Sequence, residues 1–143
     1  MAGRNGSADW SGDLQSGKGT MTVGDGVFEG PYTFKSRFEE GQGTNPEQLI
    51  AAAHAGCFTM ALSNMLAEAG TPVDRVHTTA DIELRFVDGA PTITKIDLVT
   101  EGQVPGLDQA TFEEQAQKAK EACLVSRALA GVKEMTVSAK LTS

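Results

Sequence analysis

The chain has 143 residues and a mass of 15.0 kDa, the size of one domain, and its 40% apolar and 22% charged residues are typical of a globular protein. Twelve basic and nineteen acidic side chains give a net charge of -7, so the surface repels phosphate and argues against nucleic acids and anionic membranes as partners. Two cysteines, Cys57 and Cys123, are too few for a secreted disulfide scaffold. We therefore expect one domain over residues 1–143.

The sequence also bears on where the protein works. Residues 1–13 hold no apolar run of the kind that forms a signal peptide core. No stretch of about 18 consecutive apolar residues is present, which argues against a membrane span. The cytoplasm is the default expectation, and its reducing conditions would keep the two cysteines free of each other unless oxidation is part of their chemistry.

The first predicted elements are strands. Residues 5–38 alternate loosely between apolar and polar side chains, and glycines interrupt the pattern, which predicts three or four short strands in a meander. The run Gly24-Asp25-Gly26 lacks the spacing of a nucleotide-binding loop, so we interpret it as a hairpin turn.

Residues 45–69 carry the strongest helix signal. Asn45 is a good N-cap, Pro46 suits the first helical position, and Gly70 provides a stop. The helix is apolar nearly all round between Leu49 and Leu66, so it must be buried on most sides. A chain of this size would struggle to wrap such a helix alone, which favours a homodimer that packs two of these helices together.

The remaining chain alternates strands and helices. We expect strands over 76–86 and 92–100, helices over 108–122 and 126–130, and a last strand over 132–141. The resulting order, β-β-β-α-β-β-α-α-β, predicts an α+β fold with an antiparallel sheet.

From the residues alone, several roles for the cysteines stay open. Cys57 lies mid-helix among apolar residues and could be a small core residue, whereas Cys123 precedes a helix whose N-terminus could stabilise a thiolate. His54 shares a helix face with Cys57, and the two could form a metal site with Cys123 and His77. No CxxC or HxxxH pattern supports a metal, so we expect none, and we expect His54 to face the core and bond to backbone or a partner.

The sixteen residues Gly43–Phe58 (GTNPEQLIAAAHAGCF) resemble the helix motif of the OsmC/Ohr family, the osmotically inducible protein C and organic hydroperoxide resistance proteins. The resemblance continues at residues 8–12, 36–39 and 122–126, and it is closer to the OsmC branch than to the Ohr branch. One position departs from the pattern, because the family often has proline directly after its second cysteine and this chain has Leu124.

The resemblance implies an intertwined homodimer with a long buried central helix, and a thiol-dependent peroxidase that reduces organic hydroperoxides to alcohols under oxidative or osmotic stress. Cys57 would attack the peroxide and become a sulfenic acid, and Cys123 would resolve it to a disulfide. Arg37 and Glu47 match the assisting arginine and glutamate. No cofactor is implied, and the reductant would be a dithiol such as a lipoylated protein, or another thiol.

A physical argument supports these roles. A cysteine buried in an apolar helix has a raised pKa unless a cation offsets the desolvation, and the guanidinium of Arg37 can do so. Glu47 could hold Arg37 by a bidentate pair. Glu47 and Cys57 are ten residues apart, about 15 Å along a straight helix. We therefore expect Glu47 to serve the thiol of the other subunit.

Apolar residues around these positions bear on the substrate. Phe34, Phe38, Phe58 and Met60 indicate a hydroperoxide with a hydrocarbon part. Two readings without turnover remain open: a dimer that responds to oxidation of Cys57, and a small-ligand or metal-binding dimer that uses His54, Cys57 and the apolar helix face.

Overall fold

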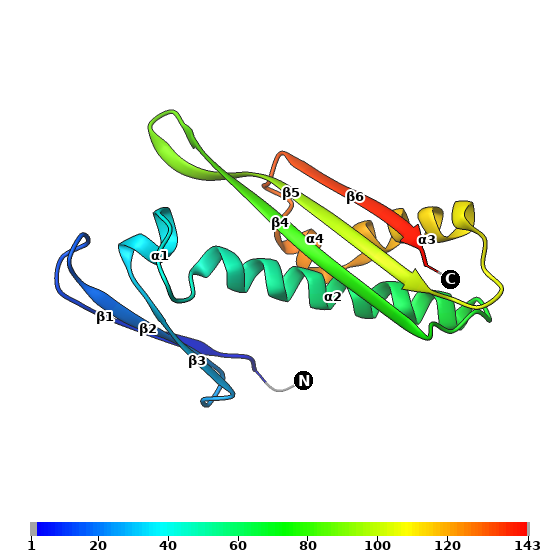
Figure 1. Ribbon diagram of the computed structural model, residues 1–143, viewed down its shortest axis with the longest axis horizontal. Helices are drawn as coiled ribbons and strands as arrows, with labels where there is room; N and C mark the ends of the chain where they lie inside the picture. Colours follow the sequence, from blue (N-terminus) through cyan, green and yellow to red (C-terminus); the bar gives the residue numbers. More distant parts are fainter. Residues whose placement is uncertain (1–2, 143) are drawn as a thin grey trace. The chain divides into compact units, whose positions relative to one another are not determined.

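The computed structural model describes residues 3–142, and within them it has six strands and four helices in the order β1-β2-β3-α1-α2-β4-β5-α3-α4-β6 (Figure 1). This order confirms the predicted succession, with one additional helix, α1. The chain divides into two compact units, one up to Leu49 and one from Ile50. The domain expected over 1–143 includes Met1, Ala2 and Ser143, which lie outside the described residues.

The first unit contains the predicted meander. β1 (Gly6–Ser11), β2 (Lys18–Val23) and β3 (Phe28–Tyr32) pair in that order, and both pairings are antiparallel. Gly24 and Gly26 have positive φ angles of 59° and 98° in the β2–β3 connection. Glycine adopts this conformation without steric cost, which confirms the predicted hairpin turn.

α1 (Phe34–Phe38) is a five-residue helix in a region where strands were expected. A capping box begins it: the Ser36 N–H donates to Thr33 Oγ1 at 3.1 Å, and the Thr33 N–H donates to Ser36 Oγ at 2.8 Å. Asn45 Nδ2 then donates to the Ser36 carbonyl at 2.8 Å. These bonds fasten α1, which carries Arg37, to the residue that caps the next helix.

α2 (Pro46–Glu68) begins at the predicted proline, where Asn45 Oδ1 accepts from the Gln48 N–H at 2.8 Å. Its buried apolar face is formed by Phe58, Leu62 and Leu66. The opposite face is not covered in one chain: Met60 is 76% exposed. The expected burial on most sides is therefore not reached within a single chain.

α2 is also long and apolar enough to be compared with a membrane-spanning helix. Among the described residues, it is the helix whose length and mean hydropathy, 1.4 over 18 residues, match those of a membrane-spanning helix, and 22% of that window is buried. The core helix of a soluble protein passes the same test. The helix meets this measure without a run of 18 consecutive apolar residues, because polar residues interrupt the run while its alanines and leucines keep the mean hydropathy high.

The second unit contains a sheet of β4 (Arg75–Val87), β5 (Ala90–Gln103) and β6 (Glu134–Leu141), in that order. β4 and β5 are antiparallel as expected, but β5 and β6 are parallel, which corrects the prediction of a wholly antiparallel sheet. The reason is the connection. α3 (Gln109–Ala122) and α4 (Leu124–Ala128) return the chain to the starting end of β5, as parallel neighbours require (Figure 1).

α2 and α3 pack on one face of this sheet and enclose the core. Phe58 and Leu62 from α2, Leu98 from β5 and Phe112 from α3 belong to one buried cluster, which also includes Cys123. Gly102 on β5 lies directly beneath the Phe112 ring, so a Cβ there would come within 2.6 Å of Phe112 Cζ. Glycine at this position therefore lets the ring approach the strand.

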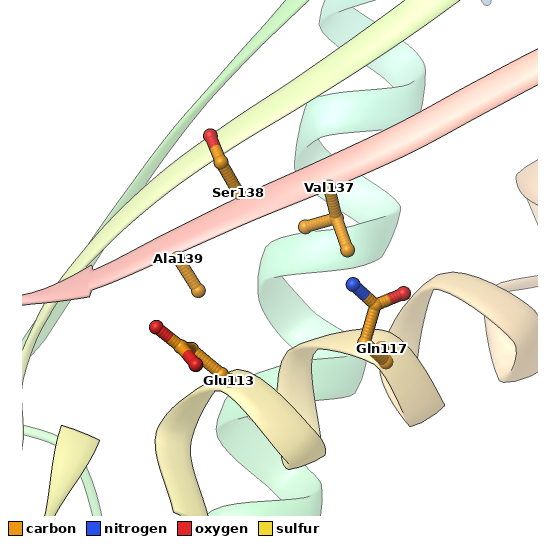
Figure 2. Close-up of a pocket in the computed structure, with 5 residues that line it drawn as sticks. All are labelled: Glu113, Gln117, Val137, Ser138 and Ala139. Atoms are coloured by element: carbon orange, nitrogen blue, oxygen red, sulfur yellow. The ribbon is translucent and has the colours of Figure 1, made fainter. Parts of the chain in front are cut away.

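One side chain from α3, Gln109, also bonds twice to the free edge of β6. Gln109 Nε2 donates to the Ala139 carbonyl, and Gln109 Oε1 accepts from the Leu141 N–H, both at 2.8 Å. Between α3 and β6 lies an open pocket of about 330 Å³ lined by Glu113, Gln117, Val137, Ser138 and Ala139 (Figure 2). Neither cysteine lines it.

Candidate active site

The structure brings the two cysteine side chains together in the second unit. Cys57 lies in the middle of α2, and Cys123 lies at the junction of α3 and α4, where its N–H donates to the Ala119 carbonyl. Both thiols are free, Cys123 is buried and Cys57 is half-buried. Cys57 packs against the buried cluster that contains Cys123, and the two side chains are near enough for each to shift the pKa of the other. Two positions far apart in the sequence thus form one dithiol site.

The surroundings act differently on the two thiols. Burial raises the pKa of Cys57, and the hydrogen bond with Cys123 raises it further, while the N–H groups of Val125 and Leu124 counteract the shift. Burial would also raise the pKa of Cys123, but hydrogen bonds from Cys57 and Ser126 outweigh burial and lower it. Within this unit, negative charge is therefore held more readily on Cys123 than on Cys57.

A histidine and a serine lie behind the dithiol. His54, one turn before Cys57 on α2, is fully buried, and its Nε2 lies 2.7 Å from Ser126 Oγ. The Ser126 N–H donates to Cys123 Sγ at 3.5 Å. Burial lowers the pKa of His54, so the ring is neutral at neutral pH. The expectation that His54 faces the core with a bonding partner is confirmed, and the partner is a side chain.

The first unit contains the predicted ion pair. Arg37 Nε and Nη2 each lie 2.9 Å from Glu47 Oε1. The pairing is confirmed, but it differs from the expected bidentate form because both nitrogens meet one oxygen. Glu47 Oε2 is buried and has no hydrogen-bond partner among residues 3–142. The Arg37 side chain is 41% exposed, and that of Glu47 is 11% exposed.

A small apolar pocket lies beside Arg37. It has a volume of about 230 Å³ and is lined by Trp10, Leu14, Tyr32, Thr33, Phe34, Arg37 and Phe38. Phe34 and Phe38 were expected near a substrate, and they do line this pocket. Phe58 instead belongs to the core of the second unit, and Met60 is on the exposed face of α2.

Sequence reasoning missed the β-strand residues of this pocket. Trp10 on β1 and Tyr32 on β3 both pair with Gly19 on β2, and their ring centroids lie 5.3 Å apart. A Cβ at Gly19 would come within 2.7 Å of both rings. A glycine between two aromatic strand positions is the signal that could have located the pocket.

The metal hypothesis grouped His54 and Cys57 with Cys123 and His77, and the structure does not form a metal site from these four residues. Within residues 3–142, no three His, Cys, Asp or Glu side chains lie in an arrangement that could hold a metal ion. His54 directs its Nε2 to Ser126.

Comparisons with known proteins find similar sequences along most of the chain. The model of the OsmC-like protein family matches residues 39–138. Peroxiredoxin OsmC of Escherichia coli (strain K12) is 50% identical over 141 residues, which are 98% of this chain and 97% of that protein. Organic hydroperoxide resistance protein OhrB of Bacillus subtilis (strain 168) is 32% identical over 115 residues, 79% of this chain and 82% of that protein.

Solved structures show the same fold. The crystal structure of OhrB of Bacillus subtilis superposes with a TM-score of 0.72 at 27% identity, covering 96% of this chain and 98% of that one. The crystal structure of an organic hydroperoxide resistance protein OsmC from Legionella pneumophila gives a TM-score of 0.69 at 26% identity and covers 100% of both chains.

Proposed function

This chain belongs to the OsmC-like protein family, and on that premise we propose that it is a thiol-dependent peroxidase that reduces organic hydroperoxides to alcohols. Relatives along most of its length carry the names peroxiredoxin and organic hydroperoxide resistance protein. Its higher identity to OsmC than to OhrB confirms the expected branch. The observation that carries the proposal is the pair of free, neighbouring thiols, Cys57 and Cys123, in one buried cluster.

The proposed reaction has three steps. The Cys57 thiolate attacks the terminal oxygen of the hydroperoxide, the O–O bond breaks, and the alkoxide leaves and takes a proton to become the alcohol. Cys123 sulfur then displaces hydroxide from the Cys57 sulfenic acid, which forms the disulfide and releases water. A dithiol finally reduces the disulfide by thiol exchange. The packing of Cys57 against the cluster that contains Cys123 supports the second step, since the two side chains start as neighbours.

Arg37 and Glu47 are proposed to activate Cys57. Burial raises the pKa of Cys57, so a cation must come close if this thiol is to react at neutral pH. The guanidinium of Arg37 is always charged, and Glu47 fixes it through two contacts of 2.9 Å while part of the side chain stays exposed. An exposed guanidinium edge can donate to both a thiolate and a peroxide oxygen.

A homodimer is proposed to complete the site. Ala53, Gly56 and Met60 form an exposed, uncharged face of α2, and nothing within 4 Å would meet a Cβ at Gly56, so a second helix can approach closely there. Two α2 helices packed through this face would cover it. We propose that the partner's Arg37 and the partner's Glu47 then serve the dithiol of each chain, as the helical distance between Glu47 and Cys57 suggests.

The apolar pocket beside Arg37 supports a substrate with a hydrocarbon part. Its aromatic lining favours a peroxide such as cumene hydroperoxide or a fatty-acid hydroperoxide over hydrogen peroxide. The proposed reductant is a dithiol, a lipoylated protein or another thiol, and the proposed location is the cytoplasm, where reduced thiols persist.

Mass spectrometry after titration with cumene hydroperoxide tests this function. One equivalent should remove two hydrogens and link Cys57 to Cys123, and excess dihydrolipoamide should then sustain turnover. Cys57→Ser should abolish both results. Stoichiometric oxidation without sustained turnover would favour the redox-responsive dimer, and no linkage at all would overturn the peroxidase proposal. If Cys57→Ser still binds a small ligand or a metal ion as the parent chain does, the result would favour the small-ligand or metal-binding dimer.

A further inference from the structure

Two residues, His54 and Ser126, connect the buried interior of the second unit to the resolving thiol of Cys123. His54 Nε2 lies 2.7 Å from Ser126 Oγ, and both residues are buried. Ser126 in turn acts on Cys123 twice: its N–H donates to Cys123 Sγ at 3.5 Å, and its hydroxyl also lowers the pKa of that thiol. The thiol peroxidase steps described above require none of these contacts, so their arrangement needs its own explanation.

The hydrogen-bond roles follow from the protonation of Cys123. A thiolate accepts hydrogen bonds and donates none, so the single proton of the Ser126 hydroxyl must point at the sulfur to stabilise it. Ser126 Oγ is then an acceptor toward the ring, and His54 Nε2 must carry the proton. The other ring nitrogen, Nδ1, is buried without a partner among the described residues, which fits a neutral ring protonated at Nε2.

We propose that Ser126 and His54 are positioning residues for Cys123: His54 orients the Ser126 hydroxyl so that it donates to the resolving sulfur. The expected effect on the rate of disulfide formation rests on the proposed peroxidase function. In disulfide formation, the Cys123 thiolate forms the S–S bond as the S–O bond of the Cys57 sulfenic acid breaks. The departing hydroxide takes up the proton that Cys123 has lost, and water leaves.

Other groups near Cys123 must be held constant in a test. Cys57 on α2 is the titratable group in direct contact, and His54 acts from the same helix through Ser126. On α3, Lys120 directs Nζ to the Met135 carbonyl of β6 at 3.3 Å. All variants below therefore share a Cys57→Ser background, which leaves a single thiol and keeps a hydroxyl donor at position 57.

The first experiment follows the ultraviolet absorbance of the Cys123 thiolate as a function of pH. It uses the full chain in the oligomeric state in which it is purified. Ser126→Ala keeps the backbone N–H but removes the hydroxyl, and it should raise the titration midpoint by about one pH unit, a tenfold loss of thiolate near neutral pH. Ser126→Thr should restore the midpoint. His54→Leu should raise it by a smaller amount, and His54→Gln, which keeps a donor, should restore most of the shift.

Ser138→Ala on the exposed side of β6 is the matched control and should leave the midpoint unchanged. An unchanged midpoint in folded Ser126→Ala, or equal midpoints in His54→Leu and His54→Gln, would overturn the proposal. If Ser126→Ala fails to fold, the two His54 variants decide. The titration uses no peroxide, so it does not depend on the peroxidase function. If the midpoint shifts as expected but the parent chain shows no turnover with peroxide, this inference stands and the peroxidase proposal is rejected.

A second experiment, in the chain with both cysteines, reads out resolution. Excess cumene hydroperoxide makes disulfide formation compete with oxidation of Cys57 to sulfinic acid. Ser126→Ala should slow disulfide formation about tenfold at neutral pH, the same factor as its loss of thiolate, and the difference should shrink as the pH rises. A defect that is independent of pH would indicate a purely structural role and contradict the proposal.

Discussion

Arg37 directs two nitrogens, Nε and Nη2, to the same oxygen of Glu47, each at 2.9 Å. A guanidinium held in this way keeps its plane fixed, yet part of its edge remains exposed for another acceptor. The ion pair therefore combines the two properties that activation of a buried thiol demands, a fixed orientation and an unused set of N–H donors.

Removal of this cation should make Cys57 a poorer nucleophile. In Arg37→Ala, we expect the pH profile of Cys57 alkylation to move upward by about one pH unit or more, with at least a tenfold slower reaction at neutral pH. Because a raised thiol pKa means less thiolate below that pKa, the deficit should disappear at high pH. Cys123→Ser supplies a background in which Cys57 alone is alkylated.

Two variants accompany this measurement. Glu47→Gln keeps the shape but weakens the hold on Arg37, so its effect should be smaller than that of Arg37→Ala. Arg85→Ala removes a control arginine that pairs with Glu83 on the exposed face of β4, and it should leave the profile unchanged. Equal rates in Arg37→Ala and in the parent chain would contradict the proposed role.

The two cysteines should fail in different ways. Cys57→Ser should abolish peroxide consumption. Cys123→Ser should still consume one equivalent, because attack needs only Cys57, and it should then hold a sulfenic acid that dimedone traps. Excess peroxide should oxidise this sulfenic acid to sulfinic acid. Mass spectrometry with and without dimedone distinguishes these outcomes. Continued turnover in Cys123→Ser at the parent rate would show that Cys123 is not the resolving thiol.

The aromatic pocket should set substrate preference. Trp10→Ala removes a large part of the lining and should lower kcat/KM for cumene hydroperoxide about tenfold, equivalent to about 1.4 kcal/mol. Hydrogen peroxide has no hydrocarbon part, so its kcat/KM should change little. Val27→Ala, an exposed turn residue of the same unit, is the control. Equal losses for both peroxides would remove the argument for a hydrocarbon site.

The exposed face of α2 should control association. The parent chain should sediment as a dimer, and Met60→Lys should shift it toward monomer, because a charge placed between two apolar helices must be desolvated. Gln117→Lys puts the same charge on the exposed side of α3 and should remain dimeric. A monomeric parent chain at working concentration would reject the homodimer and the shared site with it.

The close approach of Gly102 and Phe112 predicts a stability effect remote from the chemistry. Gly102→Ala should lower the free energy of unfolding by about 1–3 kcal/mol, since its Cβ would overlap the buried ring. Urea denaturation measures the loss. Gly131→Ala, where a Cβ meets nothing within 4 Å, should be close to neutral. Phe112→Leu, combined with Gly102→Ala, should show non-additive losses.

The parts of the fold that the sequence predicted well are those with local signals. Asn45 and Pro46 mark the start of α2 because capping is decided within one turn of helix, and alternating residues mark the strands. α1 was missed because five residues show no helical period. The parallel pairing of β6 was missed because strand direction depends on the path of α3 and α4, which no local pattern records.

The residues of the candidate site also fall into those that the sequence predicted and those that only the tertiary fold brings together. Cys57, Cys123, Arg37 and Glu47 came from a family motif, and the structure shows the two pairs that they form. Trp10 and Tyr32 depend on strand register across Gly19, and Ser126 meets His54 only when α4 reaches α2. Contacts between residues distant in the chain require the tertiary fold, and sequence spacing alone does not reveal them.

Cys123 is the last cap of α3 and the first cap of α4 at the same time: its N–H bonds the Ala119 carbonyl, and its sulfur accepts from the Ser126 N–H. A bond from this sulfur to Cys57 removes any negative charge from it, and because a neutral disulfide sulfur accepts hydrogen bonds more weakly than a thiolate does, it weakens the cap of the five-residue helix that follows. Oxidation would thus loosen a short surface helix that bears the exposed Leu124. The oxidised and reduced proteins would then present different faces to whatever thiol restores the enzyme.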